Sequence, residues 1–471
     1  MNMLQKVGSF LFGYDATDSQ NRRRVSPTPM QWSEDRVLNR HKRKQMQATS
    51  RDLMRNMSIA SWAVNKHLDY VSTFSFQSRM PDPEFNRRFE ELVTWWSRPY
   101  NCDTTGRFSF PQLIRMMEQR RTIDGDVFIL KNTDGRIQII ESDRVRSPEG
   151  YSAGMSGEYA DSQVVQGVQL GRTGRHQRYA VSNRSGTGYQ FDRWYPSSRI
   201  EHLGYFNRYD QVRGISPLAP AINTFTDLYE CYSYALAKAK LSQILGIAIT
   251  RESFGEESDP IEYEIDFATT GVKTLNMEPG DAAEILESKN PSNEFQSFTE
   301  QMTMAALKAL DLPMILYNEA WTNYSGARSA LLQYESSSES KRLSLTSTLD
   351  RLVAWRASMW IRDGLLELPR GMSVSDLRWE WVSRGVPWVD PLKEIKADIA
   401  AINAGLLSRQ QVSKRYGREW TDTVKQLAQE EALIAELGVT LSESEMVGVE
   451  PEPEPEQSDG IVDRDTANPS V

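Results

Sequence analysis

Residues 207–240 read NRYDQVRGISPLAPAINTFTDLYECYSYALAKAK and pass from a loop with arginine and glycine, through two prolines, into a long helix pattern. Pro217 and Pro220 fit the first turn of a helix, where a missing backbone N–H leaves no hydrogen bond unmade. Residues 221–250 then contain no proline and one glycine. Thirty helical residues span about 45 Å. The stretch therefore predicts a charged loop joined directly to a helix longer than a typical globular helix.

The sequence before this joint predicts helices followed by a sheet. Residues 36–70 contain neither proline nor glycine. Apolar residues recur there at the spacing of one helix face: Leu53, Met57, Ala60 and Val64. Between 122 and 203 the apolar residues form short or alternating runs, GDVFIL, IQIIES, VVQGVQL, RYAV and IEHLGYF, separated by turn residues. These runs predict strands of a mixed or antiparallel sheet, and hence an α+β fold.

The sequence after the joint predicts more helices. Strand-like runs IEYEIDF and KTLNM precede SNEFQSFTEQMTMAALKAL, which carries a helical apolar stripe. Residues 327–361 lack glycine and proline and span about 52 Å if they form one helix; we expect their polar middle, 335–342, to face water or another copy of the chain. Residues 389–438 predict three short helices with a capping box at Ser408 and Gln411. We expect the first of these helices to bury one face: Leu392, Ile395, Ile399 and Ile402.

Charge is unevenly distributed along the 471 residues, whose net charge is −9. Residues 1–56 carry eleven Lys/Arg and five Asp/Glu, and residues 439–471 carry nine acids and one arginine, which leaves −7 for residues 57–438. A mildly acidic body argues against tight, sequence-specific DNA binding. The Glu-Pro-rich tail has too few bulky apolar residues to fold alone. No run approaches the length of a membrane span, so we expect no membrane association.

The sequence lacks the motifs of common enzyme chemistry. There is no GxxxxGK[ST], HExxH or GxSxG motif, and Cys102 and Cys231 have no companions for a zinc site. We therefore expect no catalytic residue, no cofactor and no metal site. One alternative stays open, a metal-dependent nuclease, because five acids lie close together in sequence and would suit a divalent cation if they converged: Asp124, Asp126, Asp134, Glu141 and Asp143. His202 beside Glu201 does not predict an acid/base pair, because strand alternation places them on opposite faces.

Seven stretches carry a further signal through their order. They are SRDLMRNMSIASWAV (50–64), FEELVTWW with CDTTGRFSF and IDGDVFIL (89–130), IQIIESDRV (137–145), RIEHLGYFNRYDQVRGISPLAPAI (199–222), DLYECYSYALAKAK (227–240), LDLPMILYNEAWTNYSGARSALLQ (310–333) and VDPLKEIKADIAAINAGLLSRQQV (389–412). In this order the sequence resembles the lambda-type family of tailed-phage portal proteins over about residues 30–440. The acidic EPEPEPE tail departs from the family, and either a solubilising role or a contact for scaffold or protease fits it.

The resemblance implies a domain order for a subunit that assembles into a ring. It is a flexible basic N-terminal arm (1–35), an α/β wing (36–215), a stem helix (216–250), a small β-containing clip (251–290), a second stem helix (291–312), a tunnel loop (313–326), a long helix that returns to the wing (327–388), a crown-like C-terminal helical domain (389–438) and a disordered acidic tail (439–471).

The resemblance also implies a function, partners and a location. Portal proteins form a ring, usually of twelve subunits, at one capsid vertex, and DNA passes through its channel during packaging and ejection. The implied partners are further copies of the chain, double-stranded DNA passing non-specifically through the channel, the terminase large subunit, head–tail connector proteins, and the major capsid and scaffold proteins. The implied location is the virion, and the host cytoplasm during assembly. The alternative is the nuclease of a phage packaging complex.

Two groups of residues are the candidate functional positions under this resemblance. The tunnel loop places polar and aromatic residues at the channel: Asn318, Glu319, Trp321, Asn323 and Tyr324. For Trp321 and Tyr324, packing onto a neighbouring subunit is an open alternative. The joint between wing and stem is expected to lie where neighbouring subunits meet: Arg213, Gly214, Ile215 and Leu218.

Overall fold

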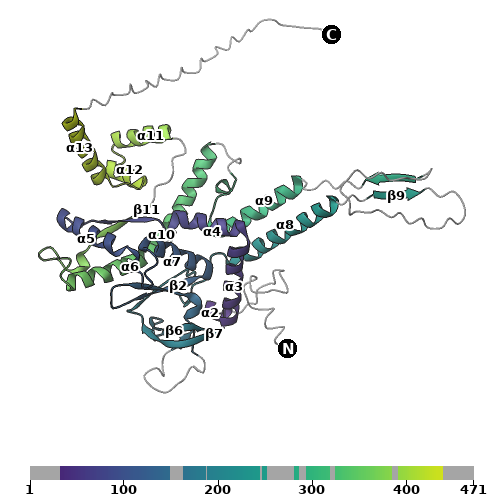
Figure 1. Cartoon of the computed structure of the whole chain (residues 1–471), viewed down its shortest axis with the longest axis horizontal. Helices are drawn as coiled ribbons and strands as arrows, with labels where there is room; N and C mark the ends of the chain where they lie inside the picture. The colour runs from purple at the N-terminus through teal and green to yellow at the C-terminus, as the bar shows by residue number, and fades with distance from the viewer. Residues whose placement is uncertain are drawn as a thin grey trace, which may run out of the picture. The chain divides into compact units, whose positions relative to one another are not determined.

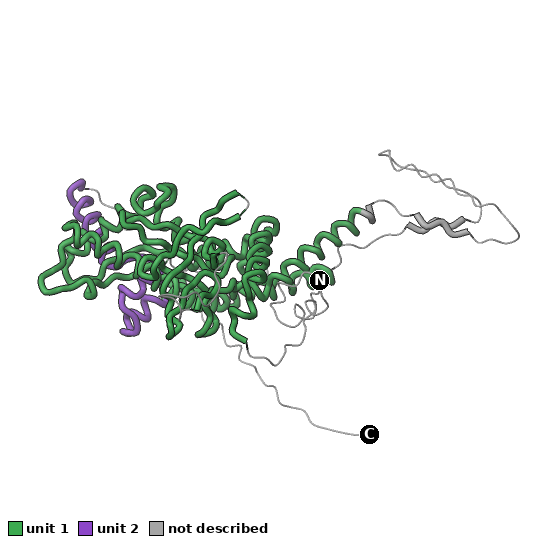
Figure 2. Tube along the Cα trace, turned by 90° about the horizontal axis from the view of Figure 1, so that it is seen from below, with its two compact units in different colours: residues 1–396 green, residues 397–471 purple. Residues whose placement is uncertain are grey.

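The computed structural model describes residues 32–148, 163–186, 188–243, 247–251, 281–285, 293–318, 324–383 and 391–438. These residues form an α+β fold that is mostly helical, with small antiparallel sheets (Figure 1). The chain divides into two compact units, residues 1–396 and 397–471, which Figure 2 colours green and purple. Over the described residues, every helix is too short or too polar to cross a membrane.

The first helices are α2 (Glu34–Val37), α3 (Arg40–Asn56) and α4 (Ser58–Val71). The Asn39 side chain caps α3 by accepting hydrogen bonds from the backbone N–H groups of His41 and Lys42, both at 3.1 Å. The predicted burial is confirmed for all four residues of the apolar pattern: Leu53, Met57, Ala60 and Val64. The prediction that they form one helix face is wrong, because Met57 has an extended backbone between α3 and α4 and divides the pattern between two helices.

Helices α5 (Pro83–Trp96), α6 (Pro99–Cys102) and α7 (Phe110–Asp124) come next. Helix α7 was not expected from the sequence, although its start carries a recognisable signal. Ser109 and Gln112 form a capping box, and Pro111 lies in the first turn. The helix ends at Gly125, whose φ of +94° suits glycine.

A three-stranded antiparallel sheet lies at the centre of the first unit. Its order is β3 (Ile137–Glu141), β2 (Asp126–Lys131), β8 (Ile200–Gly204). A second sheet has the order β4 (Gln163–Val165), β5 (Val168–Leu170), β6 (His176–Ser185), β7 (Gly188–Pro196). The sheets predicted between 122 and 203 are confirmed as antiparallel, and β7 adds a strand that no quoted run covered.

The chain returns to the first unit late in the sequence. Strand β11 (Trp379–Ser383) pairs antiparallel with β1 (Phe74–Ser78), so that Phe76 lies opposite Trp381. The indole N–H groups of Trp379 and Trp381 both donate to Asp350, at 2.7 and 2.8 Å. This pairing closes one side of the largest apolar core, which also takes side chains from α5, α7 and the long helix α10 (Tyr324–Arg362).

Two further cores flank the central sheet. One lies between the two sheets and contains Phe128, Tyr179 and Val181. The other joins α3 and α4 to the start of α8 (Ile222–Gln243) and the end of α9 (Asn293–Leu307). Residues 207–240 thus begin beside the sheets. The first turns of α8 pack in an apolar core that α8 shares with α3, α4 and α9.

Helices α8 and α9 lie side by side (Figure 1). Helix α8 ends earlier than the expected residue 250, because Ile247–Arg251 forms strand β9, which pairs with β10 (Asp281–Ile285). The β-branched residues of the IAIT run favour strand over helix. The predicted strand runs IEYEIDF and KTLNM lie outside the described residues.

Helix α10 has 39 residues and corrects one expectation. Its polar middle, 335–342, does not face only water or another copy, because Ser338 and Arg342 are buried within the subunit. Arg342 donates to the Tyr70 backbone oxygen at 2.9 Å and is paired with Glu335. Local pairing of this kind makes polar residues tolerable at a buried helix contact.

Helices α11 (Pro391–Asn403), α12 (Arg409–Arg415) and α13 (Trp420–Leu437) confirm the three short helices, including the Ser408–Gln411 capping box. The buried face predicted for the first is wrong for this chain alone, because three of its residues are exposed: Leu392, Ile395 and Ile399. Ile402 is half-buried. Most of the N-terminal arm and the whole acidic tail lie outside the described residues.

Candidate functional site

The joint residues predicted from sequence lie together at the base of α8. Arg213, Gly214, Ile215 and Leu218 are all buried by their own chain. Ile215 and Leu218 belong to the apolar core shared by α3, α4 and α8. These four residues therefore connect parts of one subunit, and none presents a side chain at the subunit surface.

Glycine at two positions lets three backbone segments approach closely. A Cβ added at Gly214 would lie 2.2 Å from the Gly125 carbonyl oxygen, and one added at Gly125 would lie 2.6 Å from the Gly214 oxygen. Tyr205 N–H donates to the Gly125 oxygen at 3.0 Å, and Ile215 N–H donates to the Tyr205 oxygen at 3.0 Å. Backbone hydrogen bonds thus hold together the end of α7, the residue that follows β8 and the start of the joint.

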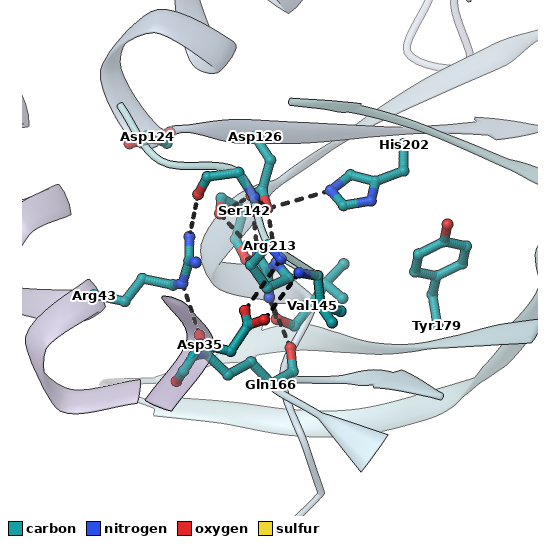
Figure 3. A network of polar contacts seen from close by, with 12 residues as sticks. Asp35, Arg43, Asp124, Asp126, Ser142, Val145, Gln166, Tyr179, His202 and Arg213 are labelled. Atoms are coloured by element: carbon teal, nitrogen blue, oxygen red, sulfur yellow. Dashed lines mark hydrogen bonds and ion pairs between the residues drawn. The ribbon is translucent and has the colours of Figure 1, made fainter. Parts of the chain in front are cut away.

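Arg213 is the centre of a buried polar network (Figure 3). Its Nε and Nη2 donate to the two oxygens of Asp126 at 2.7 and 3.0 Å. Its Nη1 donates to the Val145 and Gln166 oxygens at 2.9 and 2.7 Å, and Nη2 also reaches the Ser142 oxygen at 3.0 Å. All five N–H groups of the guanidinium therefore have an acceptor, as a fully buried arginine requires.

Asp126, at the start of β2, accepts from several groups besides Arg213. The Gly214 backbone N–H donates at 2.9 Å and His202 Nε2 at 3.2 Å. The Ser142 hydroxyl also donates to this carboxylate. Burial by itself raises the pKa of Asp126, but the Arg213 charge and these hydrogen bonds outweigh it and hold the pKa well below the usual value. The carboxylate is therefore charged throughout the neutral range.

Segments from the N-terminal part clamp the same network. Arg43 of α3 donates to the Gly214 oxygen at 2.6 Å and to the Gln166 side chain at 2.7 Å. Asp35 of α2 accepts from the Val212 and Arg213 backbone N–H groups at 2.9 and 3.3 Å. The orientation of α8 at its base is thus fixed by charged groups from α2, α3 and β2 and by the neutral Gln166 of the β4–β5 turn.

The acids that suggested a metal site bind arginines instead. Arg51 donates to both oxygens of Asp124, at 2.7 and 2.9 Å, and to Asp143 at 3.2 Å. Glu141 pairs with Arg184 at 2.7 Å. Asp134 caps its own turn at the Arg136 N–H. In the parts of the chain that the structure describes, no group of three or more His, Cys, Asp or Glu side chains is placed to hold a metal ion.

His202 and Glu201 point to opposite faces of β8, as the sequence predicts. His202 stacks on Phe128, with ring centroids 4.3 Å apart. Glu201 instead pairs with Lys131 at 2.8 Å and with Arg351 of α10. The two side chains therefore do not form an acid/base pair.

A second buried network joins α4, α7 and α10. Glu118 of α7 contacts His67 at 3.0 Å, Arg121 at 2.7 Å and the Tyr205 hydroxyl at 2.9 Å. Arg121 also donates to Ser344 of α10 at 2.9 Å. Burial by itself raises the pKa of Glu118. The charge of Arg121 and the hydrogen bond with His67 outweigh burial and lower the pKa to about 2. The network ties α10, which follows the predicted tunnel loop, to the sheet-containing part.

We expect the Glu118 network to make stability depend on pH on the acid side. The pKa of Glu118 in the folded chain, about 2, lies below its ordinary value of 4.5. The charged carboxylate therefore adds to the free energy of unfolding above about pH 4.5, and this contribution is lost as the pH falls towards 2. The shift corresponds to roughly 3 kcal/mol. In Glu118→Gln, urea unfolding of the subunit at pH 7 and pH 3 should give a smaller difference than in the unaltered chain. The exposed Glu84→Gln serves as the control, and equal pH dependence in both variants would refute this role.

The predicted tunnel loop is described only at its ends. Asn318 is half-buried after the short turn Met314–Leu316, and Tyr324 is the first residue of α10. Glu319, Trp321 and Asn323 lie outside the described residues. Tyr317, next to Asn318, packs edge-on against Trp62 of α4 at 5.6 Å between ring centroids. The start of the loop is therefore fixed against the base of the α8–α9 pair.

The α8–α9 pair itself exposes large apolar side chains. On α8 these are Tyr229, Tyr232, Tyr234 and Leu236, and on α9 they are Phe298 and Met304. Tyr232 contacts Phe295 across the pair at 6.4 Å between ring centroids. Sequence inspection did not single out these residues, although their aromatic character on a long helix was a usable signal.

Comparison with known proteins identifies the family. The model of the family described as phage portal protein, lambda family, matches residues 20–342. A probable portal protein of Halomonas phage phiHAP-1 is 24% identical over 388 residues, covering 76% of this chain and 72% of the relative.

Solved structures of similar chains come from gene transfer agent (GTA) particles. They are the neck of an empty GTA particle, with a TM-score of 0.49 and 14% identity, and the virion of a native GTA particle, with a TM-score of 0.46 and 16% identity. Each match covers 78% of this chain and 93% of the other. Because the family model matches more than half of the chain, this protein belongs to the lambda family of phage portal proteins, structural components of the virion that form the DNA-packaging channel and are not enzymes.

Proposed function

We propose that this chain forms a closed ring of about twelve copies at one capsid vertex, with double-stranded DNA passing non-specifically through its axial channel. Helices α8 and α9 are the stem, residues 251–290 are the clip, and residues 313–326 are the tunnel loop. Residues 36–215 form the wing, to which residues 327–388 return, and residues 389–438 form the crown. Membership of the portal family supports this assignment.

The exposed apolar surface of the stem carries the proposal. Tyr229, Tyr232, Tyr234 and Leu236 are exposed along α8. Tyr229, Tyr232 and Leu236 recur at the three- and four-residue spacing of one helix side, whereas Tyr234 lies on another side of α8. Neighbouring exposed apolar side chains on a soluble protein mark sites that another molecule covers. A neighbouring stem in a ring would cover them by a head-to-tail contact that closes by rotation.

The C-terminal helices support the same assembly. Among residues 391–438 no apolar side chain is fully buried. Large apolar side chains are exposed on all parts of this segment: Leu392, Ile395, Ile399, Leu406, Val424, Leu427, Leu433 and Leu437. Short helices gain most of their stability from packing an apolar face. Crown helices of neighbouring copies would supply that packing.

Charge favours translocation over retention. Residues 57–438 carry a net charge of −7, and a mildly acidic channel lets phosphates slide where a basic one would hold them. We further propose that the clip docks the terminase large subunit during packaging and the head–tail connector afterwards. Contacts with the major capsid and scaffold proteins belong to the same proposal, and family membership is their support.

The tunnel loop offers the test of the channel. Asn323→Lys should add one cation per subunit, and thus a ring of like charges around the DNA, so that salt-sensitive DNA retention rises and packaging slows while rings still assemble. Ser358→Lys, at an exposed position of α10, adds the same charge elsewhere and should leave packaging unchanged. A normal packaging rate for Asn323→Lys, with no added salt-dependent binding, would show that residues 317–326 do not line the channel.

A further inference from the structure

Arg356, near the C-terminal end of α10, is buried without an oxygen acceptor. The residue is 8% exposed, and its one hydrogen bond among the described residues runs from Nη1 to the Met359 sulfur at 3.8 Å. A thioether is a weak acceptor. The Nε of Arg356 is fully buried and has no partner in the described parts of the chain. A guanidinium buried in this way carries an uncompensated charge.

The other buried arginines of the described chain differ from Arg356 in this respect. Each of them donates to a carboxylate or to a backbone oxygen: Arg43, Arg121, Arg213 and Arg342. Arg213 has the usual geometry, because its Nε and Nη2 hold the two oxygens of Asp126 (Figure 3). The same edge of the Arg356 guanidinium, formed by Nε and Nη2, meets no acceptor among the residues that the structure describes.

The neighbours of Arg356 fix its guanidinium in place. The group lies over the Trp360 ring, with Cζ 5.0 Å from the ring centroid. A Cβ added at Gly135 would lie 2.2 Å from Nη1, so the glycine lets the guanidinium lie against the backbone of the β2–β3 turn. The Gly135 oxygen already accepts from the Trp96 indole at 2.9 Å. These contacts position the charge, and the cation–π contact offsets only part of the cost of its desolvation.

The charged groups near Arg356 have partners of their own. Asp134 accepts from the Arg136 backbone N–H at 3.0 Å, and Asp363 pairs with Arg362 at 3.0 Å. Burial lowers the pKa of Arg356, and the two acids oppose this effect only in part. The side chains of Asp134 and Asp363 are 54% and 43% exposed, so that water screens their charges. Arg356 therefore lies close to the protein surface without a counter-charge of its own.

A second unpaired donor lies one helical turn further along α10. Trp360 is fully buried, and its Nε1 has no acceptor within the described ranges. Residues four apart share one side of a helix, so Arg356 and Trp360 place two unpaired donors on the same side of α10. A ligand at this position must therefore accept hydrogen bonds and carry negative charge.

We propose that Arg356 is the anchor of a carboxylate-binding site, in which its Nε–Nη2 edge holds both oxygens of one carboxylate. The pairs Arg213–Asp126 and Arg51–Asp124 use the same edge in the same way. A planar, singly charged carboxylate matches this planar fork. A phosphate dianion would bring more charge to a single buried cation and would cost more to desolvate.

The carboxylate belongs either to an Asp or Glu side chain of another copy of the chain or to a separate molecule. The site itself does not depend on ring formation. Its test is therefore made on the full-length chain at a dilution at which light scattering finds monomers, with acetate as the probe.

Urea unfolding in sodium acetate and in sodium chloride at equal ionic strength measures the binding. At about ten times its dissociation constant, acetate should raise the folded-to-unfolded ratio about elevenfold relative to chloride. Arg356→Met removes the donors and should lose this gain. In chloride this variant should be at least as stable as the unaltered chain, because it removes an unpaired buried charge. Arg362→Met, at a side chain that is 68% exposed, is the matched control and should keep the gain.

The protein concentration separates the two sources of the carboxylate. An acetate gain that disappears as the copies associate assigns the carboxylate to another copy of the chain. A gain that persists in the associated protein assigns it to a separate molecule.

Three results would overturn the proposal. An equal acetate gain in Arg356→Met and Arg362→Met would make acetate a general stabiliser only. No acetate gain in the unaltered monomer, together with a loss of stability of Arg356→Met in chloride, would show that water satisfies the guanidinium. A larger gain in sodium phosphate than in acetate, lost in Arg356→Met, would make phosphate and not a carboxylate the ligand.

Discussion

Replacing Arg213 with alanine is expected to lower the free energy of unfolding of the subunit by about 3–5 kcal/mol, because breaking a buried ion pair leaves an uncompensated charge. Asp126 is fully buried and depends on Arg213 for two hydrogen bonds and its counter-charge. The same change frees the Val145, Gln166 and Ser142 oxygens. Urea unfolding followed by tryptophan fluorescence measures the loss.

A double-mutant cycle separates the ion pair from the rest of the network. Arg213→Ala combined with Asp126→Ala should cost less than the sum of the two single changes, because the second change removes the unpaired charge. Arg362→Ala, at a side chain that is 68% exposed, should stay within about 0.5 kcal/mol of the unaltered chain. A loss for Arg213→Ala no larger than that of this control would remove the network from the account of the joint.

Replacing Tyr234 with glutamate is expected to abolish ring assembly while the subunit still folds. Tyr234 is 72% exposed on α8 in the single chain, so a charge there costs the free subunit little. In a ring, a neighbouring subunit would cover this position. A carboxylate buried there without a partner would cost on the order of several kcal/mol at each subunit interface. Light scattering after size-exclusion chromatography should therefore find monomers.

Tyr100→Glu is the matched control for this change. Tyr100 is 76% exposed but lies on α6, away from the proposed stem contact. This variant should form rings like the unaltered chain. If Tyr234→Glu forms rings equally well, the exposed face of α8 is not the subunit interface.

The helices and the central strands were predictable because their signals are local. Ala60 and Val64 follow the helix period within α4, and Ser408 with Gln411 marks a helix start within four residues. Helix α7 also carried a local capping box at Ser109 and Gln112. The β1–β11 pair was not predictable in this way, since Phe76 and Trp381 lie far apart in the sequence and no local signal connects the two strands.

The joint was found from sequence as a location, but its chemistry was not. Arg213 and Gly214 stood out beside the prolines of a long helix. Their partners Asp126, Arg43 and Asp35 are distant in sequence, and no spacing rule connects them. The same limit applies to the C-terminal helices, because periodicity shows which face is apolar and does not show whether its partner belongs to the same chain.

The native mass of the purified full-length protein tests the central claim most directly. At micromolar concentration, with the scaffold protein present, the account predicts one dominant species with a mass of about twelve subunits, the number that the portal resemblance implies for a closed heterologous ring. Electron micrographs of the same sample should then contain rings with an axial hole. A strictly monomeric mass under these conditions would contradict the assignment of α8 and α9 as stem helices of a portal channel.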